Sequence, residues 1–222
     1  MNNDRHIIVL GAGGHAKVLL DTLLSGSVTI LGIIDNDSSL LGTSLLGVPV
    51  LGGDQKLNDL PKESVWLVNG VGSVAPINHH RKIYEKFKMR GYLFKSVIHP
   101  SSIIAKDIEL PEGIQVMAGA ILQTGTSVGE NTIINTGASA DHDCEIGAHV
   151  QLGPSVTLSG RVKVGDDTHI GTGANIVQGV RIGRGSFVGA GALVIQNLPD
   201  GTYVRAIPAE RTLPSAREKG LL

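Results

Sequence analysis

The second part of the chain carries an aliphatic residue at every sixth position. Counting in sixes from Ile98 to Val194, each position holds Ile, Leu or Val except Ala140. Glycine often follows this position, and a small or apolar residue often precedes it by two. A helix cannot keep a six-residue period on one face, whereas a parallel β-helix can, because each short strand is stabilised by stacking on the next coil. The pattern therefore predicts a parallel β-helix over residues 97–195.

The first part of the chain follows the pattern of an α/β unit. HIIVLGAGGHAKVLLDTLL predicts a strand, a glycine turn and an amphipathic helix, and VTILGIIDND predicts a second strand. SVWLVNGVGS predicts a third strand ending at Asn69, and INHHRKIYEKFKMRG predicts a helix with His79 and His80 on a solvated face. We therefore expect an incomplete, Rossmann-like α/β domain over residues 1–96, then the β-helix, and a C-terminal capping tail over residues 196–222.

A glycine-rich turn in the first domain has the spacing of a nucleotide-binding loop. Gly11, Gly13 and Ala16 fit the pattern G-x-G-x-x-G/A, and Asp35 follows where an acidic side chain can meet a ribose hydroxyl. The motif alone leaves three alternatives open: a dinucleotide site, a site for another phosphate ligand, and a plain tight turn. The domain has too few strands for a full dinucleotide fold, which argues against NAD.

Composition and charge exclude several classes of protein. The chain has 222 residues, 41% of them hydrophobic, and a net charge of −1 without runs of like charge, so we expect no nucleic-acid or membrane partner. Its start lacks the layout of a signal peptide and no apolar run is long enough for a membrane span, so we expect a cytoplasmic protein. The single cysteine, Cys144, excludes an internal disulfide, and its place in the repeat predicts packing inside the β-helix.

A histidine, His142, lies within the aliphatic repeat. His142 lies between Asp141 and Asp143, two residues after Ala140, so its side chain should point away from the interior. A histidine beside a carboxylate is a candidate general base, although an exposed histidine between aspartates is more often a solvated surface group. If three hexads form one coil, Gly160 lies one coil away on the same edge and leaves room beside the imidazole.

The motifs taken together, in their order, resemble a family. GAGGHAKV, GIIDND, VIHPSS, INTGASADHDCEIG and AIPAER are similar to segments of the bacterial sialic acid O-acetyltransferases and nucleotide-amino-sugar N-acetyltransferases. The resemblance implies a left-handed β-helix with acetyl-CoA along it, a nucleotide sugar in the N-terminal domain, and active sites between the subunits of a homotrimer. The activity it implies is acetyl-CoA-dependent N-acetylation of a nucleotide-linked amino sugar for surface glycan biosynthesis, with O-acetylation of a sialic acid as the alternative.

The resemblance also assigns roles to individual residues. His142 would be the general base, Asp143 would orient it, and Asn135 would be a further active-site residue. Apart from the resemblance, the position of Gly160 one coil from His142 suggests that its amide would bind the oxyanion. The acetyl-CoA site would comprise Gly160, Gln151, Thr172, Gly189 and Ala190, and the sugar site Gly11, Gly13, Gly14, His15, Asp35 and Asn69. Gln151 departs from the family, which often has a second histidine there, and His149 is displaced from that position by two residues.

Two functions of other classes remain open. A non-catalytic nucleotide-binding or scaffold protein would not need the pair of His142 and Asp143. A metal site like that of the γ-type carbonic anhydrases would use His142, His149 and His169, but their spacings do not match one coil, so the three side chains should point in different directions. We therefore expect no metal site, and acetyl-CoA as the co-substrate.

Overall fold

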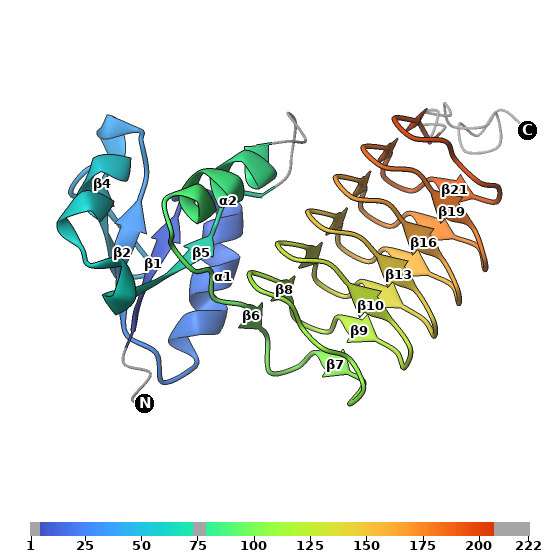
Figure 1. Cartoon of the computed structure of the whole chain (residues 1–222), viewed down its shortest axis with the longest axis horizontal. Coiled ribbons are helices and arrows are strands. Elements are labelled where there is room, and N and C mark those ends of the chain that lie inside the picture. The colour runs from blue at the N-terminus through green and yellow to red at the C-terminus, as the bar shows by residue number, and fades with distance from the viewer. Residues whose placement is uncertain (1–4, 73–78, 207–222) are drawn as a thin grey trace, which may run out of the picture.

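An α/β domain followed by a long β-helix makes up the chain, as Figure 1 shows. The structure, a computed structural model, describes residues 5–72 and 79–206. The α/β domain lies beside the first coils, and the β-helix extends away from it (Figure 1). The predicted fold class, a Rossmann-like domain and then a left-handed parallel β-helix, is confirmed.

The α/β domain is built on a five-stranded sheet with the strand order β3-β4-β2-β1-β5. Its strands are β1 (His6–Leu10), β2 (Ile30–Ile34), β3 (Ser44–Leu45), β4 (Val48–Gly52) and β5 (Val65–Asn69). Neighbours pair in parallel except β3 and β4, which form an antiparallel hairpin. β1 is an interior strand that pairs on both sides, which explains the run of buried apolar residues from Ile7 to Leu10.

One α-helix covers each face of this sheet. α1 (Gly14–Leu24) packs on the side of Ile7 and Val9, whereas α2 (His79–Met89) packs on the side of Ile8 and Leu10. The two sides alternate along β1 because successive strand residues point to opposite faces. The connecting segments contain the short 3₁₀ helices η1 (Ser38–Leu40), η2 (Asp54–Asp59) and η3 (Lys62–Ser64).

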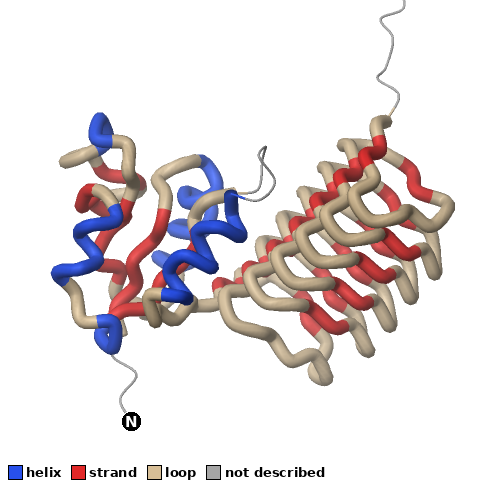
Figure 2. The backbone as a smooth tube through the Cα atoms, turned by 45° about the horizontal axis from the view of Figure 1, so that its top comes forward, coloured by secondary structure: helices blue, strands red, loops and turns tan. Residues whose placement is uncertain are grey.

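Three parallel sheets form the faces of the β-helix, which winds as a triangular prism (Figure 2). Face I contains β6 (Val97–Ile98), β8 (Gln115–Val116), β11 (Ile133–Ile134), β14 (Gln151–Leu152), β17 (His169–Ile170), β20 (Phe187–Val188) and β22 (Tyr203–Val204). Face II contains β7 (Ile103–Ile104), β9 (Ile121–Leu122), β12 (Ser139–Ala140), β15 (Thr157–Leu158), β18 (Asn175–Ile176) and β21 (Leu193–Val194). Face III contains β10 (Ser127–Val128), β13 (Glu145–Ile146), β16 (Lys163–Val164) and β19 (Arg181–Ile182).

The aliphatic repeat fills the interior of this prism. Ile134 pairs with Leu152, and Leu152 pairs with Ile170, so one coil spans three hexads. From Val116 onward every repeat position is buried except Val128, which is partly buried. The interior is narrow and close-packed, which favours aliphatic side chains over rings.

Tight turns join the faces along three edges, which we name by the faces they connect. The I–II edge contains residues 117–120, 135–138, 153–156, 171–174 and 189–192, and the II–III edge contains residues 123–126, 141–144, 159–162 and 177–180. The III–I edge contains residues 129–132, 147–150, 165–168 and 183–186. β22 continues face I beyond residue 195, and residues 207–222 of the predicted capping tail lie outside the described residues.

Candidate active site

His142 lies on the II–III edge with its side chain turned outward. Ala140 before it is fully buried, whereas the His142 side chain is 42% exposed, as the repeat predicts. Nδ1 of His142 lies 2.8 Å from Oδ2 of Asp143. If Nδ1 carries the proton and donates it to this carboxylate, the lone pair of Nε2 is available to accept a proton. Asp143 adopts a left-handed φ of 58°, a conformation that Asp tolerates better than most residues.

Two glycines on neighbouring coils make room for this pair. The imidazole of His142 lies over Gly160, where an added Cβ would be 2.7 Å from Cε1 of the ring. The carboxylate of Asp143 lies over Gly125, where an added Cβ would collide with Oδ1. The structure thus brings together three of the predicted residues, His142, Asp143 and Gly160. The space beside Gly160 is filled by the imidazole itself.

The other residues predicted for catalysis or acetyl-CoA binding lie elsewhere on the prism. Asn135, Thr172, Gly189 and Ala190 all belong to the I–II edge, separated from His142 by the width of face II. Gln151 lies on β14 in face I and is buried. One chain therefore presents two separate groups of predicted residues, one on each edge of face II.

A cleft of about 390 Å³ opens in the α/β domain at the carboxyl ends of β1 and β2. Gly11 and Asp35, two of the residues predicted for the sugar site, line this cleft. The sequence interpretation missed its other polar lining residues, which come from the loop after β2, from η2 and from α2: Asn36, Asp54, His79, Lys82 and Lys86. His79, Lys82 and Lys86 recur at the three- and four-residue spacing of one helix face, a signal that was present in the sequence.

The glycines of the predicted nucleotide loop have different structural reasons. Gly11 has a left-handed φ of 90°, and an added Cβ would be 2.8 Å from Cγ2 of Val71, so a glycine is needed there by the fold. Gly13 and Gly14, at the start of α1, have nothing within 4 Å of an added Cβ. Asp35 accepts hydrogen bonds from the amides of Ala12 (2.8 Å) and Asp37 (2.9 Å), which holds the loop against β2.

Polar side chains join the α/β domain to the β-helix. His15 lies 2.6 Å from Oε1 of Gln115 on face I, and Gln115 donates to the carbonyl of Asn69 (2.7 Å). Burial lowers the pKa of His15. Asn69 is buried, and its amide donates to the carbonyl of His80 (2.9 Å) and to Oδ1 of Asn131 (3.3 Å). Asn69 therefore serves the domain junction, while its predicted contact with the sugar stays a prediction.

The prediction that His80 lies on a solvated helix face is wrong. His80 is 2% exposed, with Nδ1 2.5 Å from the carbonyl of Val71 and Nε2 3.1 Å from the carbonyl of Asn131. Its neighbour His79 is exposed. The helix pattern alone did not show that the β-helix covers this side of α2.

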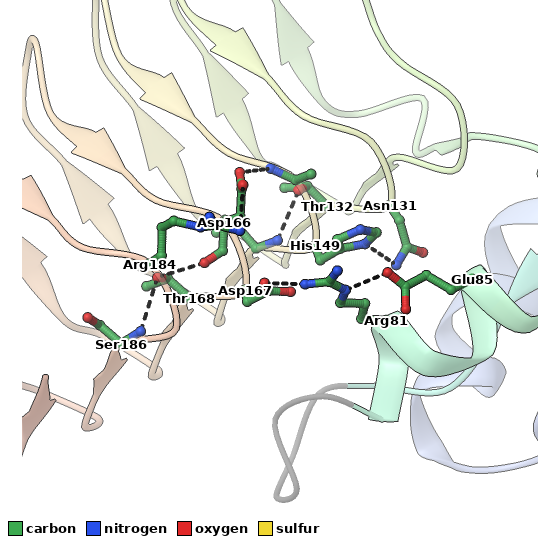
Figure 3. A network of polar contacts seen from close by, with 12 residues as sticks. Arg81, Glu85, Asn131, Thr132, His149, Asp166, Asp167, Thr168, Arg184 and Ser186 are labelled. Carbon is green, nitrogen blue, oxygen red and sulfur yellow. Dashed lines mark hydrogen bonds and ion pairs between the residues drawn. The ribbon is translucent and has the colours of Figure 1, made fainter. Parts of the chain in front are cut away.

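A second group of contacts closes the junction at the III–I edge (Figure 3). Arg81 of α2 forms an ion pair with Asp167 (2.5 Å) and with Glu85 (2.7 Å). His149 lies 3.0 Å from Nδ2 of Asn131, with its ring 5.6 Å from that of Tyr84. Figure 3 shows Arg81 reaching from α2 to the coil that carries Asp167. The α/β domain is thus fixed to face I and the III–I edge.

Both domains match known protein families. Residues 6–87 match the PglD N-terminal domain, and residues 161–196 match the bacterial transferase hexapeptide (six repeats). A His-to-Asn variant of perosamine N-acetyltransferase from Caulobacter crescentus, solved with CoA and GDP-perosamine, is 36% identical over 92% of this chain and 95% of that one, with a TM-score of 0.84. This chain belongs to the bacterial hexapeptide-repeat sugar acetyltransferases.

Two further solved structures have the same two-domain extent. The acetyltransferase domain of PglB from Neisseria gonorrhoeae, in complex with acetyl-coenzyme A, is 34% identical over 90% of this chain and 96% of that one, with a TM-score of 0.81. WeeI from Acinetobacter baumannii is 25% identical over 90% of this chain and 95% of that one, with a TM-score of 0.80. The likeness covers both domains of this sugar acetyltransferase.

Cys144 is not placed to act as a nucleophile in this sugar acetyltransferase. It is fully buried in the β-helix, as the repeat predicts, and its Sγ lies 3.3 Å from the carbonyl of Ser159. Burial raises the pKa of the Cys144 thiol. Because the thiolate is the reactive form of cysteine, this environment disfavours an acyl-cysteine intermediate.

His149, two residues before Gln151, belongs to the contacts between the α/β domain and the β-helix. His149 lies on the III–I edge and is committed to the domain junction, whereas His142 lies on the II–III edge. Burial lowers the pKa of His149, so its neutral form is favoured. Among residues 5–72 and 79–206, no three His, Cys, Asp or Glu side chains are grouped to hold a metal ion. No helix in that part of the chain is long and apolar enough to cross a membrane.

We expect the acetyltransferase to lose stability as pH falls below about 6.5, because of His80. Burial lowers the pKa of His80 from 6.5 to about 4 in the folded protein, so the unfolded chain binds a proton that the folded chain excludes. The free energy of unfolding should fall by roughly 3 kcal/mol from this group between pH 7 and pH 4. Urea unfolding at a series of pH values measures this decrease in the free energy of unfolding. His15 and His149, whose pKa values are also lowered by burial, should add to the decrease.

The control for this prediction is His80→Gln, which keeps a donor but does not titrate. Its free energy of unfolding at pH 7 should be lower than that of the wild type, but its pH dependence should be flatter. An equally steep pH dependence in both proteins would show that His80 is not responsible.

Proposed function

We propose that this sugar acetyltransferase transfers the acetyl group of acetyl-CoA to the amino group of a nucleotide-linked amino sugar. The observation that carries the proposal is the outward-facing pair of His142 and Asp143, in a chain that matches the GDP-perosamine enzyme over both domains. A scaffold protein would need neither this pair nor the two glycines that accommodate it.

The geometry supports direct transfer with His142 as the general base. The amine attacks the thioester carbonyl, and Nε2 of His142 takes the proton that the attacking nitrogen loses. Asp143 fixes the Nδ1–H tautomer and stabilises the imidazolium that forms. The carbonyl oxygen becomes an oxyanion, for which the amide of Gly160 is the proposed donor, and the intermediate collapses by expelling the CoA thiolate.

The shape of the chain supports an active site shared between copies, in the expected homotrimer. The α/β domain packs on face I and the III–I edge, whereas His142 lies on the II–III edge, opposite face I. The sugar cleft and the base of one chain are therefore on opposite sides of the prism. Ile103 and Leu193 on the outer surface of face II are 61% and 65% exposed, which favours a contact between copies there.

Contact between copies would also unite the two groups of predicted residues. Asn135, Thr172, Gly189 and Ala190 of one copy would approach His142 of the next, and acetyl-CoA would lie between them along the prism. We further expect this reaction in the cytoplasm, where nucleotide sugars and acetyl-CoA are both made.

The cleft in the α/β domain is the proposed site of the nucleotide sugar. Lys82 and Lys86 supply positive charge from α2, and Lys86 is paired with Asp54. The amides at the start of α1, beside the open space at Gly13, suit a phosphate group. Substitution of Gly13 with valine should raise the KM for the nucleotide sugar by roughly tenfold or more, with the KM for acetyl-CoA unchanged.

The fold should tolerate this substitution, which makes the kinetic result informative. Gly13 has an ordinary extended conformation (φ −81°, ψ −173°) and an added side chain meets open space. The thermal unfolding midpoint of Gly13→Val should therefore match that of the wild type. Equal increases in both KM values, in a folded variant, would make this loop a structural turn only.

Thermal stabilisation by ligands separates the proposed function from the other classes. Acetyl-CoA and CoA should raise the unfolding midpoint, because a ligand that binds only the folded state stabilises it, whereas NAD and zinc should not. Stabilisation by NAD alone would favour a dinucleotide-binding protein, and stabilisation by zinc alone would favour a metal site.

A further inference from the structure

The coil that precedes His142 holds Asp143 in place. The amide of Asp143 donates to the carbonyl of Thr124 (3.1 Å), and the carboxylate of Asp143 lies over the next residue, Gly125. An added Cβ on Gly125 would collide with Oδ1 of Asp143 and lie 3.4 Å from its Cγ. The carboxylate of Asp143 is therefore packed directly against the backbone of Gly125.

A second carboxylate, that of Asp107, lies one coil before Gly125 and holds the turn that contains it. Oδ2 of Asp107 accepts a hydrogen bond from the amide of Gly125 (2.8 Å) and another from the hydroxyl of Thr124 (3.0 Å). The amide of Gly125, and then the hydroxyl of Thr124, lower the pKa of Asp107, so it is ionised at neutral pH. The turn at Thr124 and Gly125 is thus tied to the coil before it as well as to Asp143.

We propose that Gly125, held by Asp107, is a positioning residue for the acetyl transfer. The inference rests on the proposed function, in which Asp143 fixes the tautomer of His142. A methyl group on Gly125 would force the end of the Asp143 side chain away from its position, and Nδ1 of His142 would lose its partner 2.8 Å away. The chain would fold, because the displaced atom is the end of a side chain on the surface.

The chain offers a matched control in Gly179. Gly179 lies on the same II–III edge at the same turn position, with φ of 74° against 75° for Gly125. An added Cβ on Gly179 has nothing within 4 Å. Alanine at either position suffers the same left-handed strain, of about 1–2 kcal/mol, but only alanine at Gly125 touches Asp143.

Steady-state kinetics of the two alanine variants test the proposal. Gly125→Ala should lower kcat by roughly 10- to 100-fold, the range found when the hydrogen-bond partner of a metal-binding histidine is removed, while the KM values for both substrates stay within about threefold. Gly179→Ala should keep the wild-type kcat. Both variants should lower the thermal unfolding midpoint by similar amounts.

A double-mutant cycle with Asp143→Gly shows whether the effect passes through Asp143. Glycine fits the left-handed φ of 58° at this position and removes the carboxylate. In the Asp143→Gly background, Gly125→Ala should cause no further loss of kcat, because coupled residues are not additive. Asp107→Ala, a change at an exposed residue, should cause a smaller loss of kcat, which should also disappear in the Asp143→Gly background. If Gly125→Ala does not fold, the result for Asp107→Ala decides whether this turn positions Asp143.

The proposal is overturned if Gly125→Ala keeps the wild-type kcat, if Gly179→Ala loses as much, or if the losses add in the Asp143→Gly background. Wild-type transfer and His142→Ala are measured in the same assay. If the wild type is active and His142→Ala is inactive, any of these three results rejects only the role of Gly125 and leaves the proposed function standing. An inactive wild type, or an active His142→Ala variant, rejects the proposed function instead.

Discussion

Replacement of His142 by alanine should lower kcat by roughly 10²–10⁴-fold, the usual contribution of a positioned acid or base. The imidazole is 42% exposed and supports no packed core, so the fold should survive its removal. The KM values for acetyl-CoA and the nucleotide sugar should change little, because both ligands are bound mainly by other residues. Steady-state kinetics combined with equilibrium binding of CoA measure the two effects separately.

Two neighbouring substitutions are the controls for this result. Asp143→Asn should cost less than His142→Ala, because it disturbs the base without removing it. Cys144→Ala should be nearly silent in kcat, since its thiol is buried inside the β-helix. A fully active His142→Ala variant would make this histidine a solvated surface group, and an acetyl group trapped on Cys144 would replace direct transfer with covalent catalysis.

Two impaired variants, His142→Ala and Gly13→Val, should partly recover activity when they form mixed assemblies. His142→Ala keeps the sugar cleft, and Gly13→Val keeps the base. If each site combines the cleft of one copy with the base of the next, random mixing in equal amounts yields about one intact site in four. Co-expressed variants with different tags, assayed well below the KM of Gly13→Val for the nucleotide sugar, should therefore reach about a quarter of the wild-type rate.

Mixing after separate expression, without exchange of subunits, is the control and should give no recovery. Absence of recovery in verified mixed assemblies would place the cleft and the base of one site in the same chain. A fully active monomer in sedimentation at assay concentration would contradict the shared site independently.

The β-helix was predictable because its pattern is local and repeated. Every sixth residue from Ile98 to Val194 points inward, and this alone predicted the strands, their parallel stacking and the burial of Cys144. The outward direction of His142 followed from its distance to Ala140. In such a repeat each coil contacts only the coils before and after it. Once the inward-facing position of one hexad is known, the inward-facing positions of all the others follow.

Features that depend on contacts between distant segments were not predictable in the same way. The burial of His80 requires the β-helix to cover α2, and no local pattern reports that. The role of Gly125 appears only when the carboxylate of Asp143 is seen above it. The hairpin of β3 and β4 was also hard to predict: Leu46 and Gly47, both with positive φ, join two short strands, whereas such turns usually have Asn, Asp or Gly before the glycine.

Mass spectrometry and NMR of the reaction products test the central claim most directly. The wild-type enzyme is incubated with acetyl-CoA and, in turn, with several nucleotide-linked amino sugars and free sialic acid. We predict that at least one nucleotide-linked amino sugar gains an acetyl group on its nitrogen, with one CoA released for each product formed, and that His142→Ala forms almost none. An acetyl ester on sialic acid, with no product from the amino sugars, would contradict the account.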